Sequence, residues 1–228
     1  MNPARERWLW PMAPLFLVAL YLNFLGTPDA KQLLSSERIF YFHMGSASAA
    51  GIAFLISFIA SIGYLRTRKA RWDAVAAAST EIGVILTTMV LVSGILWGKV
   101  AWGVWWTWDP RLTATVVMWI MFVAYLLLRE WTDNPDRRAS YAAVLAIVAF
   151  FIVPLNYVGV RWLNTIHPFV ITTAGIALPP SMQVAMFVSM GAFMYLYIAW
   201  MVVRVRLLEV EAGVDALKDR MRTKLDAI

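Results

Sequence analysis

Six long apolar stretches constrain this chain more than any other feature of its sequence. They lie at about 8–26, 40–65, 76–97, 114–128, 141–160 and 183–203. A helix needs roughly 20 apolar residues to cross the hydrocarbon core of a bilayer. The chain is 61% hydrophobic and only 15% charged. We therefore expect an all-α, polytopic integral membrane protein with six transmembrane helices and no separate soluble domain.

The two ends of the chain need separate interpretation. Basic residues precede the first apolar stretch, as in a signal peptide, but no clean cleavage pattern follows, so we predict a retained helix. Residues 1–203 then form a six-span membrane domain, and 204–228 form an amphipathic helix. Its apolar stripe either docks on the protein or binds a partner subunit; it consists of Leu207, Val210, Val214, Leu217, Met221 and Leu225.

The basic residues predict the orientation. Most of the 20 Lys and Arg residues flank one side, in the N-terminal segment, the loops 66–73 and 129–138, and the segment after 203. Cytoplasmic loops carry such an excess, so both termini are expected in the cytoplasm of a bacterial cell, with the chain in the inner membrane and surrounded by lipid. The net charge of +6 follows from this topology and does not indicate nucleic-acid binding.

A tryptophan-rich segment, residues 97–113 (WGKVAWGVWWTWDPRLT), faces the opposite, outer side in this topology. Trp combines a large apolar face with one N–H donor, so the cluster suits either an interfacial aromatic belt or a platform for a large flat ligand. A belt distributes its Trp over many helix ends. This segment instead places Trp102, Trp105, Trp106 and Trp108 within seven residues, before an Asp109–Pro110–Arg111 run, which favours the platform.

His43 and His167 are the only histidines in the chain, and both approach the outer face. His43 is expected about 5 Å below the outer end of the second span, and His167 lies in the loop before the sixth span. Neutral imidazole is a common axial ligand of haem iron, so the pair with the Trp segment between them suggests a bis-imidazole haem site. Cations for the haem propionates are available on the same side: Arg38, Lys99, Arg111 and Arg161.

Other uses of these residues remain open. A zinc site would add a carboxylate such as Asp109 or Glu37, but it leaves the Trp cluster unexplained. A transmembrane electron-transfer cytochrome usually has deeper histidine ligands. Glu81 lies inside the third span, where an acid either marks a functional site or has a structural role, in which it snorkels to the nearby inner interface or pairs with a basic loop residue.

Some chemistry is excluded by composition. The chain has no Cys, so it offers neither thiol catalysis, nor a disulfide, nor thiolate ligation of a metal. It also carries no Walker sequence, so it is not expected to hydrolyse ATP.

Residues 102–113 resemble the tryptophan-rich "WWD" signature of the haem-handling proteins of bacterial and mitochondrial cytochrome c assembly. The matching positions are Trp102, Gly103, Trp105, Trp106, Trp108, Asp109, Arg111, Leu112 and Thr113. With six spans and one His on each side of the signature, the whole chain is similar to the cytochrome c maturation protein C family, in which RIFYFH (38–43) and WLNTIH (162–167) match the ligand-bearing segments. Met44 and Gly45 depart from the family pattern, which often has an apolar residue and Pro after the first His.

The resemblance implies a non-enzymatic role in delivering haem b, carried as a transient cargo. His43 and His167 would be the axial ligands, and the other implied haem-binding residues are Trp102, Trp105, Trp106, Trp108, Asp109 and Arg111. The implied partners are a periplasmic haem chaperone (cytochrome c maturation protein E), the subunits of an ABC transporter and a small single-span subunit. The alternatives are a true haem permease, with Glu81 on an inner path, and a membrane-bound haem oxidoreductase, for which no substrate site is visible.

Overall fold

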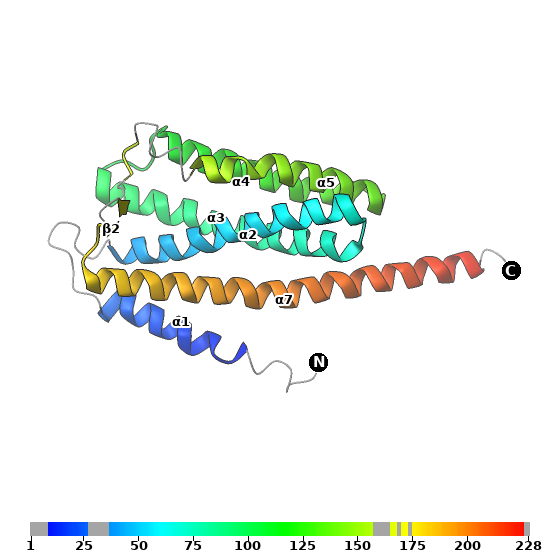
Figure 1. Cartoon of the computed structure of the whole chain (residues 1–228), viewed down its shortest axis with the longest axis horizontal. Helices are drawn as coiled ribbons and strands as arrows, with labels where there is room; N and C mark the ends of the chain where they lie inside the picture. The colour runs from blue at the N-terminus through cyan, green and yellow to red at the C-terminus, as the bar shows by residue number, and fades with distance from the viewer. Residues whose placement is uncertain (1–8, 27–36, 157–164, 168–169, 173–174, 226–228) are drawn as a thin grey trace.

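The computed structural model describes residues 9–26, 37–156, 165–167, 170–172 and 175–225, which form a bundle of long helices (Figure 1). A two-residue hairpin, β1 (Ile171–Thr172) with β2 (Gly175–Ile176), pairs antiparallel. The mainly helical fold predicted from the sequence is confirmed. The helices are α1 (Met12–Tyr21), the π-helix η3 (Leu22–Gly26), α2 (Glu37–Thr67), α3 (Ala70–Trp102), α4 (Pro110–Glu130), α5 (Pro135–Phe150) and α7 (Pro180–Leu225).

Five helical segments are long and apolar enough to cross a membrane: 38–67, 70–102, 110–130, 135–156 and 180–225. The described part of the predicted first span, α1 with η3, covers only residues 12–26. That is about 22 Å of helix at 1.5 Å per residue, less than the roughly 30 Å of a hydrocarbon core. A sixth crossing therefore stays a prediction.

Helix α2 lies at the centre of the bundle, between α3, α5 and α7. Small residues make this possible, because backbones approach closely where side chains are small. A Cβ on Gly45 would lie 2.5 Å from the Phe193 ring of α7, and one on Gly83 of α3 would lie 2.7 Å from Phe54. Phe54 in turn stacks on Phe122 of α4, with ring centroids 3.8 Å apart.

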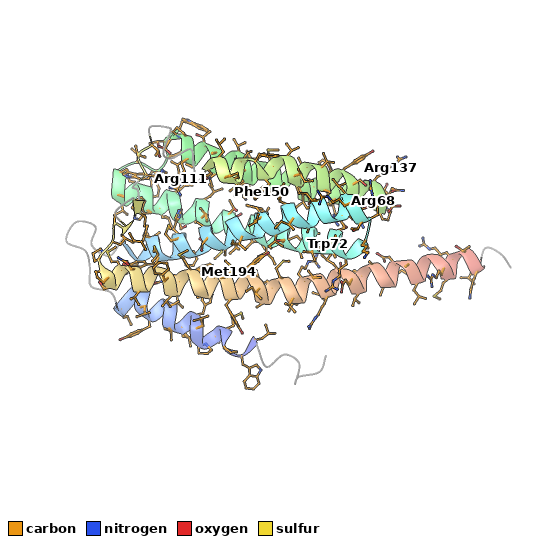
Figure 2. All side chains as sticks on the ribbon, in the orientation of Figure 1. Arg68, Trp72, Arg111, Arg137, Phe150 and Met194 are labelled. Carbon is orange, nitrogen blue, oxygen red and sulfur yellow. The ribbon has the colours of Figure 1, made fainter. Side chains whose placement is uncertain are left out.

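The turns separate into two ends of the bundle (Figures 1 and 2). One end holds the α3–α4 turn, the hairpin and the start of α7. The other holds the α2–α3 and α4–α5 turns, with Arg68 and Arg137, far from Arg111 at the first end. This separation agrees with the predicted arrangement of basic loops, and the membrane side that each end faces stays a prediction.

The predicted third and fifth spans differ from the helices in ways that bear on the site. Helix α3 continues to Trp102 and ends at Gly103, whose positive φ of 76° suits glycine. The 97–113 segment is therefore only partly a loop, over residues 103–109. The fifth span is interrupted at Phe151, before a further helical turn over 152–156. Pro154 explains the interruption, because proline lacks an N–H and its ring collides with the carbonyl four residues earlier.

The C-terminal amphipathic segment is not a separate helix. It is the continuation of α7, which runs unbroken over 46 residues and projects beyond the other helices (Figure 1). Its apolar stripe is exposed along its whole length: Leu207, Val210, Val214, Leu217, Met221 and Leu225. Of the two predicted uses of this stripe, docking on the protein itself is not observed among the described residues.

Candidate haem site at the end of the bundle

A cavity opens at the end of the bundle that carries the α3–α4 turn. The empty space in it, counted together with its open mouth, is about 1040 Å³. His43 and His167 both line it, together with Trp102 and Arg111. Four of the residues singled out in the sequence thus meet in one cavity, although they come from α2, α3, α4 and the segment before the hairpin.

His43 enters the cavity from the second turn of α2. Its Nδ1 lies 3.0 Å from Ser93 Oγ of α3. The Ser93 hydroxyl donates its hydrogen to the Met89 carbonyl at 2.6 Å, so Ser93 Oγ accepts from Nδ1–H. A neutral imidazole with its proton on Nδ1 carries its lone pair on Nε2. Gly94 leaves room for the ring, since a Cβ there would lie 3.2 Å from His43 Cε1.

His167 is held in a similar way by the start of α4. Its Nδ1 lies 3.2 Å from Thr165 Oγ1 and 3.3 Å from Asp109 Oδ1. Thr165 Oγ1 itself donates to Asp109 Oδ1 at 3.0 Å. Both oxygens can therefore accept from Nδ1–H, which again assigns the lone pair to Nε2.

The charge state of His167 follows from its surroundings. Burial first, and then the Arg111 charge, lower the pKa of His167 to about 4, although Asp109 acts in the opposite direction. The ring is neutral at pH 7, as a metal-binding imidazole must be. Its contact with Asp109 is accordingly a hydrogen bond from a neutral ring to a carboxylate.

Asp109 does not line the cavity but supports its wall. It is the N-cap of α4, accepting from the Arg111 and Leu112 backbone N–H groups at 3.0 and 3.4 Å. Its second oxygen accepts from the Ile166 N–H at 2.9 Å. Burial would raise the pKa of Asp109, but the hydrogen bonds from Ile166, Thr165 and Arg111 outweigh it and hold the pKa below its usual value. Asp109 thus ties the His167 segment to α4.

The tryptophans divide into two groups. Trp102 meets the His167 ring edge to face, with centroids 5.0 Å apart, and Trp97 meets Trp102 at the same distance; both line the cavity. The other three lie in or beside the turn, outside the cavity lining. Trp105 and Trp108 are 56% and 79% exposed, and Trp106 contacts Trp108 with centroids 5.8 Å apart.

The four predicted propionate partners also lie in different places. Arg111 lines the cavity and lies close enough to both imidazoles for its charge to act on each. Lys99 donates to the Gly103 carbonyl at 3.0 Å and lies over the Trp105 ring. Arg38 lines a separate apolar hollow between α2 and α3. Arg161 lies outside the described residues.

Among the lining residues that the sequence analysis did not assign to the site, Trp97 and Asn156 stand out. Trp97 Nε1 and Asn156 Oδ1 are buried and have no hydrogen-bond partner among the described residues. Each buried polar atom without a partner costs free energy, so a donor and an acceptor are available to a ligand. Trp97 belongs to the Trp segment and could have been included on that ground. Asn156 gives no signal in the sequence.

Glu81 serves as a structural ion-pair partner. Arg204 of α7 donates to its two carboxylate oxygens at 2.5 and 3.0 Å. This is the predicted structural role, pairing with a basic residue, but the partner belongs to helix α7 and not to a loop. Glu81 does not line the haem-site cavity.

A zinc centre finds little support. The described residues contain no group of three or more His, Cys, Asp or Glu side chains placed to hold a metal ion. Asp109, the predicted carboxylate ligand, already accepts hydrogen bonds on both oxygens. Glu37, the other candidate, begins α2.

The fold and this cavity define a multi-pass helical membrane protein with a candidate ligand site at one end of its bundle. Comparison with known proteins is more specific, because residues 3–219 match the model of the family described as Heme exporter protein C. The chain belongs to this family.

Individual relatives agree. The chain is 32% identical over 186 residues to Heme exporter protein C of Bradyrhizobium diazoefficiens, which covers 81% of the chain and 70% of the relative. It is 28% identical to that of Paracoccus denitrificans, with 83% and 80% covered. It is 33% identical to that of Escherichia coli, with 70% and 60% covered. The matched region thus spans from 60% to 80% of these relatives.

Proposed function

We propose that the chain binds haem b as cargo at the periplasmic end of the bundle and presents it to a periplasmic haem chaperone during assembly of c-type cytochromes. It acts in the bacterial inner membrane, beside the subunits of an ABC transporter and a small single-span subunit. It binds and transfers haem without catalysing a reaction of its own. Membership of a family named for haem export supports this role.

One observation carries the proposal: both histidines line a single cavity, each with Nδ1 engaged by a hydrogen-bond acceptor. Histidines that ligate metals usually donate their second ring N–H in this way, which fixes the ring and leaves Nε2 for the metal. Two such imidazoles from different segments are the ligand set that bis-histidine haem iron requires.

The rest of the lining fits the two halves of a haem molecule. Apolar side chains such as Met44, Leu91 and Val153 can contact the macrocycle, and Trp102 can pack against it. The guanidinium of Arg111 and the N–H of Trp97 are donors for the propionates. Asp109 takes part through His167 rather than by touching the haem, and Trp105, Trp106 and Trp108 form an outer surface for the chaperone.

The two alternative functions are less favoured. A permease needs ligating or polar groups along an inner path, and the best candidate, Glu81, is held by Arg204. A membrane oxidoreductase needs a second site for its substrate. A second hollow, between α2 and α3, is lined almost entirely by apolar groups and offers no such site.

The experiment replaces each ligand in turn. His43→Gly and His167→Gly are purified from membranes at matched protein levels, and haem content and the visible spectrum are recorded. Each variant should lose most of its haem, and added imidazole should restore the spectrum of a six-coordinate iron by filling the vacated position. If both variants keep wild-type haem content and spectrum without imidazole, the site assignment is wrong.

The delivery step is tested separately. Wild-type protein loaded with haem is mixed with the purified periplasmic chaperone, and haem is followed into the chaperone fraction. Transfer should require the loaded protein and should fail with either histidine variant in the absence of imidazole. If the wild-type protein keeps all of its haem in the presence of the chaperone and the transporter subunits, the protein binds haem but does not deliver it.

A further inference from the structure

The two histidines meet chemically different acceptors on Nδ1. His43 donates to a neutral hydroxyl, Ser93 Oγ, at 3.0 Å. The Nδ1–H of His167 is shared between two acceptors, the Thr165 hydroxyl at 3.2 Å and the Asp109 carboxylate at 3.3 Å. A carboxylate acceptor draws the Nδ1 proton more strongly than a hydroxyl does, which makes the opposite ring nitrogen a better electron donor to a metal.

The two acceptors also differ in how firmly they are held. The Asp109 side chain is 3% exposed and is fixed by hydrogen bonds from two elements, the start of α4 and residues 165–166. Ser93 Oγ donates to carbonyls of its own helix, Met89 at 2.6 Å and Val90 at 3.2 Å. The hydroxyl can therefore exchange acceptors without any movement of the backbone.

We propose, on the basis of the function proposed above, that Asp109 and Ser93 are positioning residues that make the two iron ligands unequal. Asp109 makes His167 the strong, retained ligand. Ser93 leaves His43 the weaker ligand, which gives way when a donor atom of the receiving protein takes the iron. Haem then leaves by ligand exchange at the His43 side.

The exchange is balanced in bonds and charge. The bond from iron to Nε2 of His43 breaks, and a bond from iron to the donor atom of the receiving protein forms. The Nδ1 proton of His43 stays on its ring, hydrogen-bonded to Ser93, and the iron keeps its oxidation state. His167 holds the haem in the cavity until the new bond exists.

Carbon monoxide on the reduced, haem-loaded protein is the probe, because it displaces one histidine and its stretching frequency reports the donor strength of the ligand that remains. We expect CO to displace His43. Asp109→Asn should then raise the C–O stretching frequency, because a weaker donor opposite CO supplies less electron density to it. Ser93→Ala should leave the frequency unchanged but speed CO binding several-fold, and Ser93→Thr should restore the wild-type rate.

The opposite result identifies the opposite ligand. If Ser93→Ala shifts the frequency and Asp109→Asn does not, CO displaces His167 and the proposal is wrong. It is equally wrong if neither variant shifts the frequency. Asparagine keeps an oxygen that can cap α4; should Asp109→Asn still fail to accumulate, Thr165→Val removes the second acceptor of the His167 Nδ1 proton and should raise the frequency in the same direction.

The glycine variants separate this proposal from the one on which it rests. The CO adduct of His43→Gly should have the wild-type stretching frequency, because His43 is already displaced in the wild-type adduct, whereas that of His167→Gly should differ. If neither glycine variant alters haem content or coordination, the haem site itself is misassigned. If both do, but their CO adducts are identical to each other, the ligand pair stands and the inequality fails.

Discussion

Towards the end of the bundle with the basic turns, charged side chains are paired with one another. Arg129 donates to Asp73 at 2.5 and 2.9 Å, joining α4 to α3, and Arg204 pairs with Glu81, joining α7 to α3. At the end with the Trp-rich turn, the two imidazoles are engaged on one side only. Each imidazole donates from Nδ1 and lines a cavity with the rest of its ring.

The difference separates polar groups that hold the bundle from polar groups that can hold a ligand. A charge pair between helices satisfies itself, and its loss leaves an unpaired charge in an apolar environment. An imidazole that is hydrogen-bonded only through Nδ1 still has its Nε2 lone pair available for a ligand. The same contrast explains why Trp97 Nε1 and Asn156 Oδ1, buried without partners among the described residues, occur in the cavity wall.

The largest expected effect lies at the paired end. Arg129→Met should lower the free energy of unfolding by about 3 kcal/mol, because it leaves the Asp73 carboxylate unpaired where both side chains are mostly buried. Haem bound per folded molecule should not change. Thermal unfolding in detergent measures the loss of stability, and the pyridine haemochrome assay measures the bound haem.

The matched control is the double variant Asp73→Asn with Arg129→Met, which removes both charges and should recover most of the loss. A fall in haem affinity in the single variant, at equal amounts of folded protein, would contradict the separation of the two ends.

Arg111 tests the ligand end directly. Arg111→Ala should weaken haem binding by roughly 10- to 100-fold, since a hydrogen bond to a charged group contributes about 1.5–3 kcal/mol. Binding of haem dimethyl ester, which lacks the propionate charges, should change little. Affinities for both ligands are compared by spectral titration.

Arg38→Ala is the control for this variant, because Arg38 lies at the same end of the bundle but lines a different hollow. It should leave both affinities unchanged. Equal losses of haem and ester binding in Arg111→Ala would instead assign Arg111 to the fold of the turn.

Much of this architecture could be read from the sequence. Five of the six long apolar runs correspond to helices able to span a membrane, because hydropathy and length suffice for that purpose. The side of the bundle shared by His43, His167 and the Trp segment followed from the alternation of spans. Helix ends were less accurate, since helices α2, α3 and α7 continue beyond the apolar core through residues that hydropathy does not mark.

Contacts across the bundle could not be read in this way. That Ser93 supports His43, or that Asp109 supports His167 through Thr165, depends on how helices are rotated and on a turn that brings residues 56 positions apart together. The sequence also suggested one Trp platform. The structure divides it, because the end of α3 directs Trp97 and Trp102 into the cavity while the turn carries the other three outside its lining.

Gly94 is a smaller test of the ligand end. A Cβ at this position would lie 3.2 Å from His43 Cε1, closer than side chains normally pack, and overpacking typically costs about 1–3 kcal/mol. Gly94→Ala should displace the His43 ring and lower haem affinity by roughly 5- to 10-fold, at the low end of that range, without loss of protein. Spectral titration measures the affinity.

Gly191→Ala provides the comparison, because a Cβ at Gly191 of α7 would meet nothing within 4 Å. It should bind haem as the wild type does. Equal affinity in the two variants would mean that the His43 ring is not confined by α3.

The smallest effect on haem binding is expected outside the cavity. Replacing Trp105 and Trp106 by Ala together removes aromatic surface that does not line the cavity, so haem affinity should stay within about twofold of the wild type, as for surface substitutions generally. Loading of the chaperone should nevertheless fall well below wild-type loading, because exposed aromatic side chains are the usual anchors of protein interfaces.

Trp102→Ala is the converse variant: it removes a side chain that contacts His167, so it should weaken haem binding first, and chaperone loading should fall only in proportion to the haem lost. Measuring haem content and chaperone loading on the same preparations distinguishes the two surfaces. If the double variant loses haem and loading in parallel, the outer tryptophans belong to the haem site after all, and the division of the Trp segment into a cavity wall and a docking surface is wrong.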